Sequence, residues 1–173
     1  MSAAIIKQLQ ENDVTELRLS DADDDCIDDF RNIAEALAQN TSLTVVRLEG
    51  YLACLRNDAR VEFVEAMTKN SSLQEIYVSD ALLVVSCITN LIVKSKNLKV
   101  LSLHNVVLQG VQELFDNCER ALLQHPSLKS FLLDEVKAAV DNIDTSKLVL
   151  AGKTKALATG PQAVHVKSAA RSA

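Results

Sequence analysis

An apolar triplet with the spacing LxxLxL occurs five times along the chain, and this repetition sets narrow limits on the fold. The triplets begin at residues 14, 43, 73, 98 and 128, so successive units are 29, 30, 25 and 30 residues long. A unit that recurs at this period predicts a repeat architecture, in which each unit buries its apolar face against the next. The five copies are Val14-Leu17-Leu19, Leu43-Val46-Leu48, Leu73-Ile76-Val78, Leu98-Leu101-Leu103 and Leu128-Phe131-Leu133.

Segments with helical periodicity lie between the triplets, which themselves alternate as short strands do. Ile5, Ile6 and Leu9 predict a short helix before the first triplet. Strand–turn–helix units that stack side by side form a solenoid, with a short parallel sheet on the concave face and helices on the convex face. The expected helix faces are Cys26, Phe30, Ile33 and Leu37; Val61, Val64 and Met67; Leu82, Val85, Ile88, Leu91 and Ile92; and Val111, Leu114, Phe115, Cys118 and Leu122.

The turns that lead from helix to strand repeat almost unchanged as Asn40-Thr41-Ser42-Leu43 and Asn70-Ser71-Ser72-Leu73, and they degrade to Ser95-Lys96-Asn97-Leu98 and His125-Pro126-Ser127-Leu128. Asn ends helices readily, and Ser and Thr bond local backbone groups. Asn40 and Asn70 also form glycosylation sequons. Because no secretory signal precedes them, we interpret both as turn residues.

The composition divides the chain into two parts. Residues 1–150 hold all 23 acidic residues and 14 of the 18 Lys and Arg residues, which gives a net charge of −9. We expect this part to be one solenoid domain with an aliphatic core, since aromatic residues make up only 3% of the chain. Residues 151–173 carry Lys153, Lys155, Lys167 and Arg171 without an acid, and we expect a basic, flexible tail.

Several functional classes are disfavoured by the same composition. An acidic domain with few aromatic residues does not suit nucleic acid, which needs a basic face or stacking platforms. No apolar stretch is long enough to span a membrane and no signal peptide begins the chain, so a soluble, intracellular, cytoplasmic protein is expected. The cysteines lack metal-ligand spacing, and neither a cofactor motif nor a catalytic constellation stands out, so we predict no metal, no cofactor and no enzyme.

The triplets, their period and the segments ALAQNTSLTVVRL and AMTKNSSLQEIYV resemble leucine-rich repeat proteins of the ribonuclease-inhibitor type, over about residues 3–136. The resemblance implies a role in binding another protein, because such repeats serve as nuclease inhibitors, GTPase activators, filament-capping proteins of the tropomodulin kind and sensors. The chain departs from that pattern where the family places Asn or Cys after the strand. Those positions hold Ala22, Tyr51, Ala81, Val106 and Val136.

Side chains that alternate with the core positions are expected on the concave face. One column across the strands begins with Arg18, Arg47 and Tyr77, and the next column includes Glu49 and His104. Neighbouring arginines repel, so they indicate a site for partner carboxylates with Tyr77 as an anchor, since Arg and Tyr are enriched in binding hot spots. The alternative is that Glu16, Glu49 and Glu75 already neutralise the arginines on a solvated face.

An acidic loop follows the first strand and contains Asp21, Asp23, Asp24 and Asp25. Its spacing does not match an EF-hand. Acidic residues at a helix start complement the helix dipole and cap free N–H groups, which is one interpretation. Electrostatic docking of a basic partner is the other.

The leading hypothesis is a non-catalytic scaffold that binds a protein partner, of unknown identity, through the concave sheet. One alternative is a structural subunit assembled through the solenoid end faces, and another is an inhibitor or effector that blocks an enzyme. Solenoids need polar caps at both ends, and the C-terminal end lacks a clear capping helix. Either the tail folds over this end, a partner covers it, or the chain self-associates through it.

Overall fold

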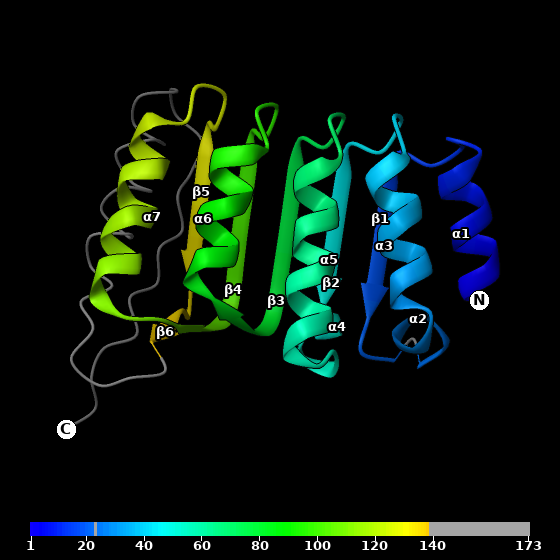
Figure 1. Ribbon diagram of the computed structural model, residues 1–173, viewed down its shortest axis with the longest axis horizontal. Coiled ribbons are helices and arrows are strands. Elements are labelled where there is room, and N and C mark those ends of the chain that lie inside the picture. The colour runs from blue at the N-terminus through cyan, green and yellow to red at the C-terminus, as the bar shows by residue number, and fades with distance from the viewer. Residues whose placement is uncertain (23, 139–173) are drawn as a thin grey trace.

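The computed structural model describes residues 1–22 and 24–138 (Figure 1). Helices and strands alternate along most of the chain, as the repeat predicts. The elements are α1 (Ser2–Gln10), β1 (Glu16–Ser20), α2 (Asp24–Asp28), α3 (Phe30–Gln39), β2 (Val45–Glu49), α4 (Tyr51–Cys54), α5 (Asn57–Lys69), β3 (Glu75–Val84), α6 (Val85–Lys94), β4 (Val100–Gln109), α7 (Gln112–Gln124), β5 (Ser130–Asp134) and β6 (Lys137–Ala138).

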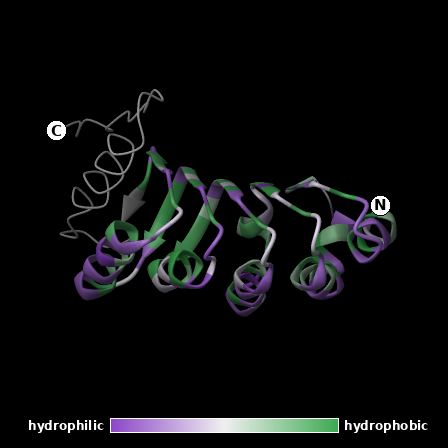
Figure 2. Cartoon of the chain, turned by 90° about the horizontal axis from the view of Figure 1, so that it is seen from above, coloured by the Kyte–Doolittle hydropathy of each residue, from purple (hydrophilic) through white to green (hydrophobic). Residues whose placement is uncertain are grey.

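The strands form one parallel sheet in the order β1-β2-β3-β4-β5, and β6 also pairs with β4. The triplets align residue by residue, so that Leu17, Val46, Ile76, Leu101 and Phe131 form one row across the sheet. Helices α1, α3, α5, α6 and α7 form a row on one side of this sheet (Figures 1 and 2). The α/β architecture of a parallel sheet with helices is therefore confirmed, and we call the sheet side away from these helices the open face.

The core lies between the sheet and the helix row. The middle and last positions of every triplet are buried there, as the alternation of a half-covered strand requires. Aromatic residues add local packing, as where the rings of Tyr51 and Phe63 meet edge to face at 5.4 Å between centroids. Cys26, Cys87 and Cys118 are buried, whereas Cys54 is exposed.

Two strands are longer than the triplets predict. β3 and β4 each span ten residues and continue past Asp80 and Asn105, which adopt positive φ values of 53° and 48°. The two extensions pair with each other from Ala81–Val106 to Val84–Gln109, so Leu82 belongs to β3 and the helix of this unit begins only at Val85. In the first unit, the single expected helix is divided into α2 and α3 around Asp29.

The helix-to-strand turns are built around a buried ladder of polar side chains. The side-chain nitrogen of Asn40 donates to the carbonyl of Leu9 (2.6 Å), and that of Asn70 donates to the carbonyls of Leu37 (2.7 Å) and Asn40 (2.9 Å). His125 continues the ladder, since its Nδ1 accepts from two backbone N–H groups and its Nε2 lies 3.0 Å from the carbonyl oxygen of Ser95. Both asparagines are buried, so in the folded protein they are turn residues and inaccessible to glycosylation.

Some predictions concern residues beyond this description. Asp23 and the tail 151–173 lie outside the described residues, as does the segment from residue 139 to the tail. The domain boundary at residue 150 and self-association through the C-terminal end therefore remain predictions. Within residues 1–22 and 24–138, none of the helices is both long and apolar enough to cross a bilayer.

Candidate functional site

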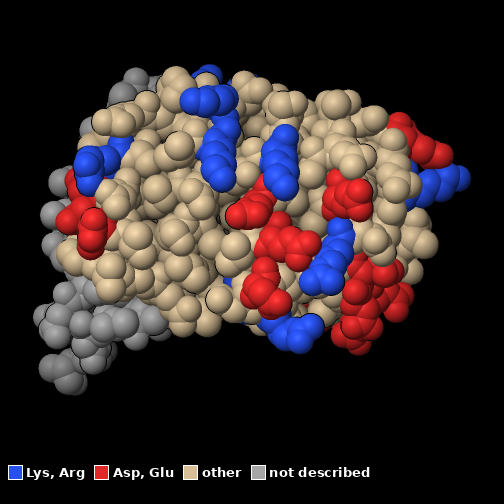
Figure 3. Space-filling model, viewed as in Figure 1, with Lys and Arg blue, Asp and Glu red and all other residues tan. Residues whose placement is uncertain are grey.

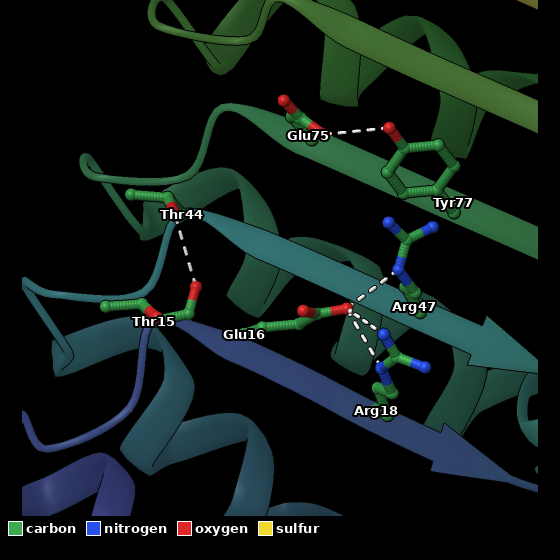
Figure 4. Close-up of polar contacts among 7 residues, drawn as sticks. All are labelled: Thr15, Glu16, Arg18, Thr44, Arg47, Glu75 and Tyr77. Atoms are coloured by element: carbon green, nitrogen blue, oxygen red, sulfur yellow. Dashed lines mark hydrogen bonds and ion pairs between the residues drawn. The ribbon is translucent and has the colours of Figure 1, made fainter.

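The open face brings the predicted column together at the N-terminal half of the sheet. Arg18, Arg47 and Tyr77 are direct partners in the strand register of β1, β2 and β3. Glu16 lies between the two arginines, and its Oε1 accepts from Nε of Arg18 at 2.9 Å and from Nε of Arg47 at 2.8 Å (Figure 4). One carboxylate thus serves two guanidinium groups, which leaves this cluster with a net positive charge.

The guanidinium of Arg47 also stacks on an aromatic ring. Its Cζ lies 3.9 Å from the ring centroid of Tyr77, and the Tyr77 hydroxyl donates to Oε2 of Glu75 at 2.8 Å. A cation over a tyrosine ring contributes on the order of 1 kcal/mol and fixes both side chains. The face therefore holds Tyr77 in one orientation before any partner arrives.

The electrostatics of the cluster follow these contacts. Hydrogen bonds from Arg47 and then Arg18 lower the pKa of the Glu16 carboxyl, and the bond to Glu16 raises the pKa of Arg47. Burial, with the bond to Glu75, raises the pKa of the Tyr77 hydroxyl. At neutral pH the cluster therefore holds two guanidinium ions, ionised Glu16 and an un-ionised phenol that is bonded to Glu75.

A shallow hollow of about 150 Å³ joins the two predicted columns. Arg47 and Tyr77 line one side, Glu49 and His104 come from the next column, and Arg18 lies outside the hollow on β1. Nδ1 of His104 lies 3.1 Å from Oδ2 of Asp134, and both side chains remain partly exposed. The hollow therefore offers hydrogen-bonding groups of both charges around one aromatic ring.

The acidic loop lies beside the N-terminus of the chain. Asp24 and Asp25 occupy the first turn of α2, where their charge complements the helix dipole. The N-terminal ammonium of Met1 lies 3.3 Å from Oδ2 of Asp25. Asp21 is exposed after β1, and its backbone N–H donates to the carbonyl of Glu49 at 3.0 Å.

A buried arginine holds the middle of the structure and was not predicted. Arg60, only 7% exposed, donates to the carbonyl oxygens of Leu52 (2.8 Å), Leu55 (2.9 Å) and Leu82 (2.6 Å). It thereby ties α4 and the following loop to the extension of β3. The sequence carries no signal for this role, because an arginine within a polar helical segment is usually solvated.

The geometry offers little for catalysis in the part of the chain that the structure describes. There, no group of three or more His, Cys, Asp and Glu side chains is placed to hold a metal ion. Burial raises the pKa of the Cys118 thiol to about 11, so this thiol is not ionised at neutral pH. Both ring nitrogens of His125 face backbone groups of the turn ladder.

Comparison with known proteins shows the fold alone. No family model matches the sequence, and no curated protein matches it. Among solved structures, the tropomodulin C-terminal domain of Caenorhabditis elegans is similar, with a TM-score of 0.64, 12% identity and coverage of 89% of this chain and 92% of that one. A structure described as Leiomodin-1 Actin-Binding Site 2 is similar with a TM-score of 0.62, 10% identity and coverage of 88% and 87%.

These likenesses correct the resemblance to the ribonuclease-inhibitor type. That assignment is wrong, because the matching structures are tropomodulin and leiomodin domains, and they indicate at most a related fold of the leucine-rich kind. The physical reason lies in the turns. At the family's position, three residues after each triplet, this chain has Ala, Tyr or Val in place of Asn or Cys, and its buried polar ladder, which includes Asn40 and Asn70, is at the opposite end of the strand.

Proposed function

We propose that the chain is a non-catalytic interaction scaffold of the leucine-rich repeat kind that binds a protein partner through the open face of its sheet. One observation carries the proposal: Arg47 and Glu75 hold Tyr77 in place beside a hollow on this face. Buried or stacked Tyr and Arg side chains supply much of the energy at protein interfaces. Side chains that are ordered before binding also reduce the entropy lost on association.

The partner we propose to test first is actin. The support is the fold shared with the leiomodin domain that is described as an actin-binding site. Arg18 is 69% exposed beside this face, so the partner is expected to place a carboxylate next to it. A role as structural subunit, assembled through the solenoid ends, remains the alternative proposal.

The experiment measures binding of purified monomeric and filamentous actin to the protein and to two matched variants. Arg18→Glu reverses a charge on the open face, and Arg31→Glu makes the same change on α3. The two arginines are matched because their side chains are 69% and 71% exposed and each pairs with one glutamate. We expect Arg18→Glu to weaken binding at least about tenfold and Arg31→Glu to change it less than about twofold.

The outcomes separate the two parts of the proposal. Equal binding by both arginine variants refutes a role for the Arg18 charge, and unchanged binding by Tyr77→Ala refutes the open face as the site. Absence of actin binding by the unmodified protein refutes actin as the partner. A Tyr77→Ala variant tests the open face without changing a charge. Loss of this central aromatic anchor is expected to raise the dissociation constant at least about thirtyfold.

A further inference from the structure

The outer edge of β1 is a surface that the proposed function uses only through the side chain of Arg18. Within the described residues β1 pairs with β2 alone, whereas β2, β3 and β4 are paired on both sides. On the β2 side, the carbonyl of Thr15 accepts from Val45 N–H (3.1 Å), and the N–H of Asp21 donates to the neighbouring strand. Because backbone groups of alternate residues point to opposite sides of a strand, those of Glu16 and Arg18 point to the outer edge.

A groove of about 310 Å³ lies between this edge and α1. Its apolar lining comes from Ile5 and Leu9 of α1 together with Val14 and Leu17. Polar side chains of the open face, including Arg18, complete its wall. A strand added to β1 therefore places every second side chain beside an apolar groove and the others beside the open face.

The charges along the edge change sign from one end of β1 to the other. The Arg18 side chain is 69% exposed and shares Glu16 with Arg47, so the middle of the edge is positive. Beyond the strand, Asp24 and Asp25 are exposed at the start of α2, Asp25 with the Met1 ammonium 3.3 Å away, and Figure 3 shows acidic side chains gathered over α2. A segment that fits this edge carries a carboxylate beside Arg18 and a basic residue beside the aspartates.

We propose that the outer edge of β1 binds one extended segment of a partner protein as an added strand, with its apolar side chains in the groove beside α1 and its acidic side chain beside Arg18. Backbone hydrogen bonds to Glu16 and Arg18 supply affinity, and the groove and charges supply the choice of sequence. The same arrangement gives the acidic loop a role, because its carboxylates attract the basic residue and so fix which end of the bound segment lies beside the loop. This site is separate from Tyr77, which lies two strands away.

The probe is a fluorescein-labelled heptapeptide with the sequence Thr-Val-Glu-Val-Lys-Val-Thr, capped at both ends. The peptide is expected to run parallel to β1, with its valines facing the groove and its glutamate beside Arg18. Its lysine, two residues further on, then lies beside Ser20 and points toward the acidic start of α2. Binding is measured by fluorescence anisotropy, and amide hydrogen exchange of the protein is measured by NMR with saturating peptide. We expect exchange at the Glu16 and Arg18 amides to slow by at least about tenfold, because these N–H groups gain acceptors.

Two variants of one residue separate backbone pairing from side-chain charge. Arg18→Pro removes the N–H that points away from β2 and so spares the existing ladder, as proline does on edge strands. Arg18→Val removes the same charge but keeps the N–H. We expect Arg18→Pro to bind at least about tenfold more weakly than Arg18→Val, and Tyr77→Ala to bind as the unmodified protein does.

Several results overturn the proposal. One is the absence of an anisotropy change at peptide concentrations up to about 1 mM, because a dissociation constant above that value is too weak for a specific site. Another is protection that appears around Arg47 and Tyr77 with none at the β1 amides. A peptide with Glu and Lys exchanged that binds equally well refutes the charge assignment. If Arg18→Pro loses its native circular dichroism, amide protection in the unmodified protein decides the question.

Discussion

Replacing Asn70 by alanine tests how much the buried turn ladder contributes to stability. Asn70 is 3% exposed, and its Nδ2 donates to the carbonyls of Leu37 (2.7 Å) and Asn40 (2.9 Å). Its Oδ1 accepts from the backbone N–H groups of Ser72 (2.9 Å) and Leu73 (3.0 Å). Alanine removes all these bonds and leaves backbone groups of two successive units without their partner.

The size of the effect follows from the number of bonds and their burial. A buried hydrogen bond contributes a net stability of about 1 kcal/mol, and a buried group left unsatisfied costs about 1–3 kcal/mol. For the bonds of Asn70 we expect the free energy of unfolding to fall by about 4 kcal/mol in total. Against a typical total of about 5–15 kcal/mol this is a large loss, and it lowers the melting temperature by roughly 10 °C.

The assay is urea unfolding followed by far-ultraviolet circular dichroism, with Asn97→Ala as the control. Asn97 occupies a turn of the same kind, but its amide is exposed and makes one bond, to the carbonyl of Ser71 at 2.7 Å. We expect the control to lose less than about 1 kcal/mol, because water replaces an exposed partner. If Asn70→Ala and Asn97→Ala differ by less than about 1 kcal/mol, the ladder is not the stabilising element that we infer.

Three further predictions concern single side chains. A thiol reagent is expected to modify the exposed Cys54 rapidly. The buried Cys118, whose pKa is raised to about 11, is expected to react only after unfolding, and rapid modification of Cys118 in the native state contradicts its burial. The pKa of Glu16 is lowered from its ordinary value of 4.5, so the stability that it contributes is complete above that pH and is lost as pH falls through the lowered pKa. NMR titration of the Glu16 carboxyl checks this lowered pKa, and Arg47→Gln should raise the pKa because it removes the hydrogen bond that lowers it most. His125→Asn should retain stability to within about 1 kcal/mol while His125→Ala loses about 2 kcal/mol, because Asn reproduces the acceptor and donor of the ladder; equal losses in thermal melts argue against this role.

The strand register was predictable because the apolar triplet fixes both the spacing within a strand and the offset between strands. No insertion interrupts a triplet, so Arg18, Arg47 and Tyr77 had to become neighbours. The partners within the column were harder to predict. The alternative that glutamates neutralise the arginines holds for Glu16, which bonds both, whereas Glu75 bonds Tyr77 instead. Which glutamate pairs with which arginine depends on side-chain rotamers, about which an alternating pattern carries no information.

Three other features could not be predicted from the sequence, each for a physical reason. Arg60 occupies a position that looks solvated, and only the path of the chain around Leu52, Leu55 and Leu82 places three carbonyls near its guanidinium. The four-residue helix α4 is too short to leave a periodic signal. The extension of β3 past Asp80 depends on a positive φ, which Asp adopts only in some contexts.

The ladder residues and the residues of positive φ together indicate where this chain tolerates changes in length. In each of the later units, the second residue after the triplet lies ten positions beyond the ladder position: Gly50 after Asn40, Asp80 after Asn70, Asn105 after Ser95 and Glu135 after His125. The unit of 25 residues is shorter only in the remaining segment, which runs from Asp80 to Ser95. Insertions and deletions, evolutionary or engineered, are therefore expected in the segments that run from a strand to the next ladder residue. A single residue added within a ten-position segment shifts that strand out of register with its neighbours.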